Sequence, residues 1–186
     1  MLQLEITKKE LWDNEREEFL YIEATTLQLE HSLVSIREWE SKWHKPFLSD
    51  QEKTYEETLD YIRCMSLEPI SDPNVVYGVS QEQFSKIIDY INEKMTASWI
   101  NAKKEEVSNH KQNPTTSEVI YAMMFELGIP IECQNWHFNH LIMQIQVSAE
   151  RQKPSKKKSK AELTQEYKEI NARRRAEYEA MKNAKQ

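Results

Sequence analysis

Three side chains that can bind transition metals stand close together near the end of the chain: Cys133, His137 and His140. Their offsets of four and three would place them on one face of a helix. One thiolate and two imidazoles suit zinc, but a structural zinc site takes four ligands. The other histidines are scattered, and no second cluster supplies the fourth. We therefore predict a buried cysteine beside partly packed histidines, with no metal and no cofactor.

Catalytic patterns that can be recognised locally are missing from the sequence. Carboxylates are frequent, as in the strings EREE and YEE, but acid–base catalysis needs two carboxylates in differently tuned environments, and no pair stands out. The chain has only two glycines, Gly78 and Gly128. Neither a glycine-rich phosphate loop nor a G-x-S-x-G elbow can form from them. We predict that the protein is not an enzyme.

Charge is distributed unevenly along the chain. The formal net charge of the 186 residues is −6. Residues 151–186 carry 12 Lys and Arg against 5 Asp and Glu, whereas residues 1–150 carry 13 against 26. We therefore predict an acidic, mostly helical globular body over residues 1–152, followed by a basic linker and an extended, partly disordered helix over residues 153–186.

The basic segment contains the pattern of a helix with little to bury. Pro154 and the run SKKKSK form the linker, and Ser159 with Glu162 has the spacing of a capping box. A thin apolar stripe follows and is interrupted by Arg174. Isolated helices are marginal without packing, so we expect this one to fray or to order fully on a partner.

Six cations of the same segment are candidate partner-binding residues. They are Lys156, Lys157, Lys158, Arg173, Arg174 and Arg175. Such side chains can neutralise nucleic-acid phosphates. Glutamates are interleaved with them, however, and the acidic body would repel a duplex. The segment is therefore either a solvated charged helix or a docking helix for an acidic or amphipathic protein helix.

The first thirty residues show the alternation of strands. Leu2, Leu4 and Ile6 alternate with polar residues, and residues 19–30 alternate again. Between these two stretches, Thr7 and Glu10 have capping-box spacing, which predicts a short helix. We expect a small N-terminal antiparallel sheet.

Helical periodicity dominates the rest of the body, so the predicted fold class is mostly α (α+β). Leu33, Ile36, Trp39 and Trp43 share one helical face, and Pro46 ends that helix at or before residue 45. Further capping boxes are predicted at Thr54 with Glu57, Ser80 with Gln83, and Thr115 with Glu118. Gly128 occupies a left-handed helix end, and a last helix is predicted over residues 133–152, with Trp136 among its buried side chains. Loops are predicted around Pro69 and residues 71–74 and over residues 101–114, with a short extended piece at 96–100.

Trp39 and Trp43 allow two interpretations. Two tryptophans one helical turn apart can form an exposed hot spot for a partner, and we include both as candidate partner-binding residues. The same spacing is also typical of a buried helix face.

The chain shows no signal peptide, no apolar run long enough to cross a membrane, and two widely separated cysteines, Cys64 and Cys133. These features predict a cytoplasmic protein with reduced thiols.

Four strings resemble a family of small proteins from long-tailed bacteriophages. They are LQLEHSLVSIREWESKWHKPFL (27–48), KTYEETLDYIRCM (53–65), TSEVIYAMMFELGIPIECQNWHFNHLIMQIQV (116–147) and KPSKKKSKAEL (153–163). The similarity covers most of the chain in the same order and spacing. In that family the position corresponding to His140 tends to be Arg, which argues against a shared metal site.

The resemblance implies a tail assembly chaperone. Such proteins are non-enzymatic and act in the host cytoplasm of an infected bacterium. They bind the long helical tape-measure protein, keep it soluble, and help the major tail protein, which forms the tube, to gather around it; they can also associate with themselves. An adaptable apolar surface would suit this task, and Met65, Met95, Met123, Met124 and Met143 offer one.

Two alternatives remain open from the sequence. One is a structural virion protein, such as a minor tail or head–tail connector component. The other is a nucleic-acid-binding phage regulator that uses the basic C-terminal segment, whose affinity would fall steeply with salt.

Overall fold

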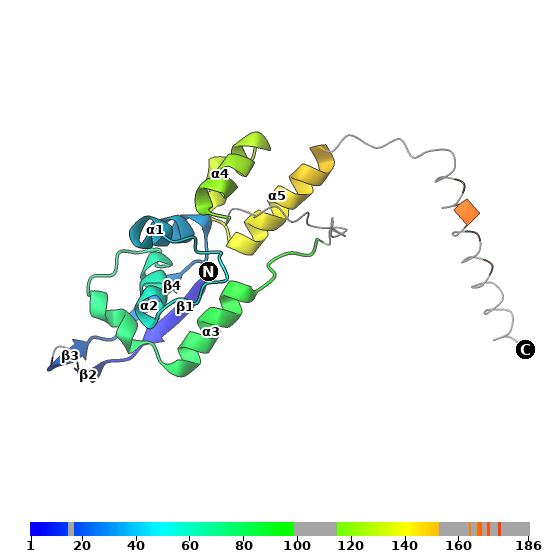
Figure 1. Cartoon of the computed structure of the whole chain (residues 1–186). Coiled ribbons are helices and arrows are strands. Elements are labelled where there is room, and N and C mark those ends of the chain that lie inside the picture. Colours follow the sequence, from blue (N-terminus) through cyan, green and yellow to red (C-terminus); the bar gives the residue numbers. More distant parts are fainter. Residues whose placement is uncertain are drawn as a thin grey trace, which may run out of the picture. The chain divides into compact units, whose positions relative to one another are not determined.

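The structure is a computed structural model (Figure 1). It describes residues 1–14, 17–98 and 115–152, together with Thr164, Tyr167, Lys168, Asn171 and Arg175, which are helical. The chain divides into two compact units, Met1–Glu150 and Arg151–Gln186. The predicted loop over residues 101–114 and the predicted linker lie outside the described residues.

The first unit is a mostly helical α+β domain with a small antiparallel sheet at its start, as predicted. Its strands are β1 (Leu2–Ile6), β2 (Lys9–Asp13), β3 (Glu18–Ile22) and β4 (Thr25–Leu29). Its α-helices are α1 (Leu33–Trp43), α2 (Tyr55–Cys64), α3 (Gln81–Asn92), α4 (Ser117–Glu126) and α5 (Phe138–Gln152, which ends in the second unit), and its 3-10 helices are η1 (Pro73–Gly78) and η2 (Ile131–Asn135).

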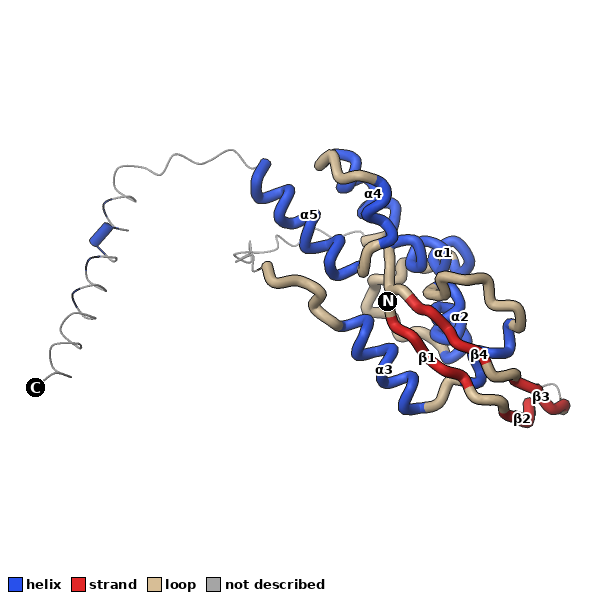
Figure 2. The backbone as a smooth tube through the Cα atoms, turned by 180° about the vertical axis from the view of Figure 1, so that it is seen from behind, coloured by secondary structure: helices blue, strands red, loops and turns tan. Residues whose placement is uncertain are grey.

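The four strands form two antiparallel pairs, one after the other along a single hairpin. β1 pairs with β4, with Leu2 opposite Leu29, and β2 pairs with β3. Figure 2 shows β2 and β3 continuing from the ends of the β1–β4 pair. The short helix predicted to start at Thr7 is therefore wrong. Trp12 lies opposite Phe19, with ring centroids 4.9 Å apart and edge to face, and such cross-strand pairs outweigh the local capping-box spacing.

Capping boxes begin three consecutive helices. Ser32 with Ser35 caps α1, and the predicted boxes at Thr54 with Glu57 and Ser80 with Gln83 are confirmed for α2 and α3. Each box satisfies backbone N–H groups that the first helical turn leaves without partners.

The helix α4 differs from its prediction at its start. It begins after Thr116, which makes no side-chain capping hydrogen bond, so the capping box predicted at Thr115 with Glu118 is wrong. At its other end, Gly128 has φ of +67°, the left-handed conformation that the sequence predicts. Part of the loop predicted at 71–74 forms the start of η1, and residues 96–98 have no regular structure.

One core joins the sheet to the helices. Apolar side chains on one face of β1 and β4 pack in a single cluster with residues of α1, α2, α3, α4 and α5. Its most deeply buried members include Ile22, Leu29, Leu33, Ile36, Trp39, Leu59, Ile62, Ile120, Met124 and Leu141. This core holds the outer edge of β4 and the outer face of α4 in fixed positions at the surface.

Gly78 ends η1 where the chain passes over the sheet. A Cβ atom on it would lie 2.8 Å from Cγ2 of Ile6 and 3.1 Å from Cγ2 of Ile22, both buried. We expect Gly78→Ala to destabilise the fold by about 1–3 kcal/mol through overpacking. Urea unfolding of the two proteins measures this. Gly128→Ala tests left-handed strain instead, since nothing lies within 4 Å of its Cβ position. Equal stability of wild type and Gly78→Ala would contradict the close packing.

Candidate partner-binding surfaces

The candidate metal ligands are not arranged as a helical face. Cys133 lies in η2, and α5 begins only at Phe138, so the predicted continuous helix is wrong in its first turns. His137 is buried, with Nε2 3.0 Å from the carbonyl oxygen of Tyr90. His140 is exposed and stacks on Trp136, with centroids 4.8 Å apart. Among the described residues, no three His, Cys, Asp or Glu side chains are grouped to hold a metal ion.

The two tryptophans of α1 are engaged inside the protein. Trp39 is 1% exposed, and its indole N–H donates to the carbonyl oxygen of Glu57 at 2.7 Å. Trp43 is half-buried and donates to Oδ2 of Asp60 at 2.9 Å. The face of α1 that carries Trp39 packs against α2, so Trp39 cannot contact a partner while the chain is folded. Trp39 is therefore not part of the partner-binding surface proposed below.

The carboxylates under these rings are paired with cations. Glu57 contacts Lys45, and Asp60 contacts Lys42 and, at 3.4 Å, Arg63. The hydrogen bond from Lys45 is the main cause that lowers the pKa of Glu57. Burial alone would raise the pKa of Asp60, but hydrogen bonds from Lys42 and Trp43 outweigh it and the pKa is lowered. Both groups stay ionised at neutral pH, whereas a general acid needs a raised pKa.

A buried polar cluster lies between β4 and the helices and was not predicted. Nδ1 of His31 lies within hydrogen-bond distance of the Tyr61 hydroxyl, and that hydroxyl is 3.3 Å from Oγ of Ser35. The ring of His137 lies 5.3 Å from that of His31. Burial, reinforced by His137, lowers the pKa of His31 to about 3. One feature of the sequence could have predicted the burial of His31: it follows Leu27 and Leu29 at intervals of two, on the side of the strand that faces the core.

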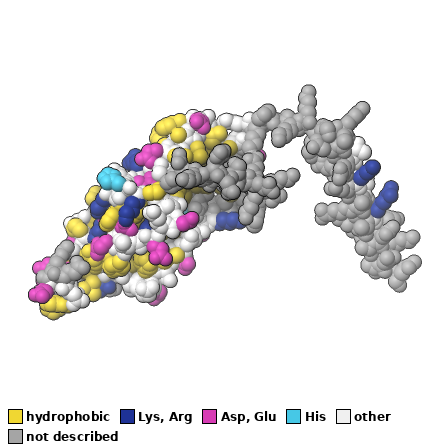
Figure 3. Space-filling model, in the orientation of Figure 1, with side chains coloured by type: hydrophobic (Ala, Val, Ile, Leu, Met, Phe, Trp, Pro, Cys, Tyr) yellow, Lys and Arg dark blue, Asp and Glu magenta, His cyan; other side chains and the backbone are white. Residues whose placement is uncertain are grey.

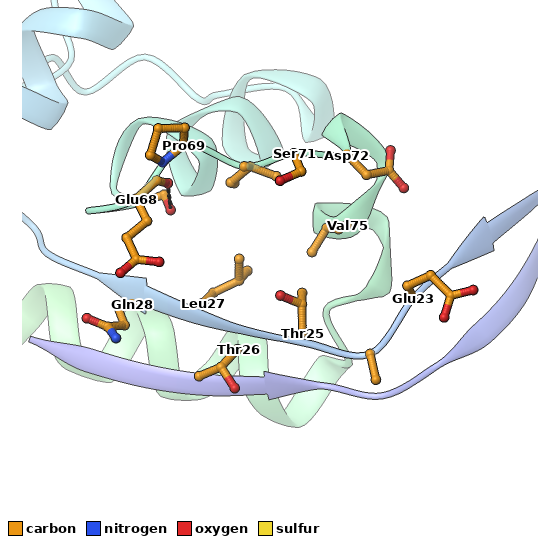
Figure 4. Close-up of a pocket in the computed structure, with 13 residues that line it drawn as sticks. Glu23, Thr25, Thr26, Leu27, Gln28, Glu68, Pro69, Ser71, Asp72 and Val75 are labelled. Carbon is orange, nitrogen blue, oxygen red and sulfur yellow. Dashed lines mark hydrogen bonds between the residues drawn. The ribbon is translucent and has the colours of Figure 1, made fainter.

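A groove of about 420 Å³ opens beside β4 (Figure 4). Its volume falls within the range of about 300–1,000 Å³ that is common for ligand sites. One wall is formed by residues 23–28, which include most of β4, and the opposite wall is the loop Glu68–Asp72 with Val75. Figure 4 shows Thr25 and Leu27 directed from the strand toward that loop.

The groove lies where an isolated antiparallel bridge between Leu29 and Ser66 is not extended along β4. The Leu67 N–H donates to the carbonyl oxygen of Gln28 at 2.9 Å, and the Glu30 N–H donates to that of Met65 at 2.8 Å. Continuing this ladder would place residue 69 opposite Thr26. Residue 69 is a proline, which has no N–H to donate, so the chain leaves the strand at this point.

The second surface consists of exposed apolar side chains on α4. The helix is apolar on most of its circumference and buries Ile120 and Met124 in the core. Val119, Met123 and Phe125 remain outside, with exposed fractions of 40%, 41% and 66%. Figure 3 shows hydrophobic side chains gathered over α4. Val119 and Met123 lie one turn apart on the same side of the helix, whereas Phe125, two residues after Met123, points to the other side. We call these three exposed residues the α4 surface.

Exposed apolar side chains continue just after α4. Ile131 and Trp136 are 40% and 39% exposed. Trp136 is thus not buried as predicted, because it precedes α5 and stacks on the exposed His140. Exposed glutamates accompany this stretch at positions 118, 126 and 132. Of the methionines expected to offer adaptable surface, Met123 is exposed, whereas Met65 and Met124 are core residues.

The basic candidates lie in the other unit. Lys156, Lys157, Lys158, Arg173 and Arg174 fall outside the described residues, and Arg175 is helical and exposed. Their role as partner-binding residues stays a prediction.

Comparison of the chain with protein-family models, curated proteins and solved structures gives no match. Each helix in the described ranges is too short or too polar to cross a lipid bilayer.

Proposed function

We propose that this protein is a non-enzymatic assembly chaperone that holds an apolar helical segment of a phage tail protein in the host cytoplasm. Its client would be the tape-measure protein, the major tail protein, or both. The observation that carries the proposal is the α4 surface, where one helix buries a stripe in the core and leaves Val119, Met123 and Phe125 to solvent.

The chemistry of the α4 surface suits an amphipathic helix. A partner helix presents apolar residues at intervals of three and four, and Val119 and Met123 have the same interval on α4. Met123 adds an unbranched, polarizable side chain that can adjust to different partner side chains. Phe125 supplies the largest exposed apolar area of the three.

Charge narrows the class of partner helix. Glu118, Glu126 and Glu132 are exposed beside the apolar residues, and residues 1–150 carry an excess of 13 acidic groups. Potentials of opposite sign favour encounter and register at an interface. The favoured client segment therefore carries Lys or Arg on the flanks of its apolar stripe.

The α4 surface can be tested by co-expressing the chain with the tape-measure protein of its own phage, and separately with the major tail protein. We expect the client to stay soluble and to copurify. The double variant Val119→Glu, Met123→Glu should reduce copurified client at least about tenfold, because two desolvated contacts are replaced by charges. Both positions are exposed, so the free energy of unfolding should change little.

A matched control comes from α3, where Ile88 is 44% exposed. Ile88→Glu introduces one of the two negative charges of the double variant on another helix and should leave client recovery unchanged. Equal recovery with the double variant and wild type would remove the α4 surface from the proposal. Failure of the wild-type chain to keep either client soluble would overturn the chaperone function itself.

A further inference from the structure

The backbone of β4 presents hydrogen-bonding groups to the groove. Along an antiparallel strand, the N–H and C=O of successive residues point alternately to the two sides. The backbone groups of Gln28 and Glu30 bond to Leu67 and Met65, on the side of β4 away from β1. The backbone N–H and C=O of Thr26 therefore also point away from β1. Thr26 is exposed, and Pro69 stands where the next donor of the ladder would be. The groove therefore offers one donor and one acceptor in strand geometry.

The floor of the groove is apolar. Leu27 and Val75 are buried beneath it, and Ile70 is half-buried on the loop side. A strand laid along Thr26 would direct alternate side chains toward this floor. One apolar side chain of a ligand can be covered there.

The rim of the groove is acidic. Glu23, Glu68 and Asp72 line it, and no Lys or Arg belongs to its lining. Glu23 pairs with Lys8 at 2.9 Å, and Asp72 accepts from the backbone N–H of Asn74 at 2.9 Å. Figure 4 shows the Glu68 carboxylate directed from the loop toward β4. A ligand with a basic side chain beside its apolar one matches this rim.

We propose that this groove binds a short extended segment of a partner protein as an added strand on β4, with an apolar residue over Leu27 and Val75 and a Lys or Arg beside Glu68. Backbone bonds to Thr26 give affinity, and the floor and rim give selectivity. The site uses neither the α4 surface nor the chaperone proposal, so each can fail without the other.

The probe is a short capped peptide of alternating Lys and Val, added to the isotope-labelled full-length chain. We expect the amide signal of Thr26 to shift and its hydrogen exchange to slow, because a peptide carbonyl accepts from its N–H. The same peptide with N-methylated backbone amides should bind at least about tenfold more weakly, since it cannot donate to the Thr26 carbonyl. A peptide of alternating Glu and Val should also bind more weakly.

Two protein variants separate backbone from side chain at one position. Thr26→Pro removes the outward N–H and should weaken binding about tenfold. Pairing with β1 does not use that N–H, and edge positions tolerate proline. Thr26→Val keeps the backbone and should bind like wild type. Glu68→Lys needs no backbone change and should reverse the preference between the Lys and Glu peptides.

Three results would overturn the proposal. The first is a bound Lys and Val peptide that leaves the Thr26 amide unchanged. The second is equal affinity for the N-methylated peptide, which would mean that no strand is formed. The third is unchanged affinity in a Thr26→Pro protein whose amide spectrum shows an intact fold.

Discussion

Replacing Trp39 by alanine should lower the free energy of unfolding by about 3–5 kcal/mol, the range for deleting a large buried aromatic side chain. Trp39 is 1% exposed and packs edge-on against Phe47, with centroids 5.2 Å apart. Its removal also leaves the Glu57 carbonyl oxygen without the indole N–H at 2.7 Å. Urea unfolding followed by circular dichroism measures the change.

Trp43→Ala is the matched comparison for Trp39→Ala. Trp43 lies one turn further along α1 and is half-buried, so its loss should destabilise the fold less. A change below about 1 kcal/mol for Trp39→Ala would contradict its position in the core. It would also support the other interpretation of the Trp39 and Trp43 spacing, in which both side chains are exposed to a partner.

The second large effect is a loss of stability on mild acidification. The pKa of His31 is lowered from 6.5 to about 3 in the folded protein, first by burial and then by the neighbouring His137. Between these values the unfolded chain binds a proton at His31 that the folded chain does not. Stability therefore falls as pH falls, by about 1.5 kcal/mol between pH 6.5 and pH 5 from this group.

The contribution of His31 is isolated by His31→Gln. Glutamine does not titrate, so the variant should lose that part of the pH dependence whatever its absolute stability. The comparison uses the slope of the unfolding free energy against pH over a window above the ordinary range of carboxylates. A variant with the wild-type slope would show that His31 takes up its proton in the folded state.

Local sequence predicts much of this fold because several helices begin with a capping box, a pattern contained within four consecutive residues. The boxes at Thr54 and Ser80 needed no tertiary information. The same spacing at Thr7 gave a wrong prediction of a helix, since the cross-strand contact between Trp12 and Phe19 favours a strand in that segment. Helix periodicity placed Trp39 on a face but could not tell whether that face was covered.

The two proposed binding surfaces could not be predicted for a related reason. The groove depends on the backbone hydrogen bonds between residues 65–67 and β4, and no residue near Thr26 in the sequence predicts that contact. On α4 nearly every position is apolar, so periodicity does not show which side the core takes. Pro69 lies in a loop, as predicted, but its effect on the edge of β4 appears only once the contact of residues 65–67 with that strand is known.

The way the β1–β4 pair is bordered also bears on aggregation. A long open strand edge can template pairing with further copies of the same chain. The outer edge of β1 lies beside α3, where Nε2 of Gln83 donates to the carbonyl oxygen of Glu5 at 2.6 Å (Figure 1). The outer edge of β4 is occupied by residues 65–67 and then bordered by Pro69 and acidic side chains. We therefore expect this sheet to admit one short strand without nucleating a growing stack, so that concentrated protein stays free of fibrils.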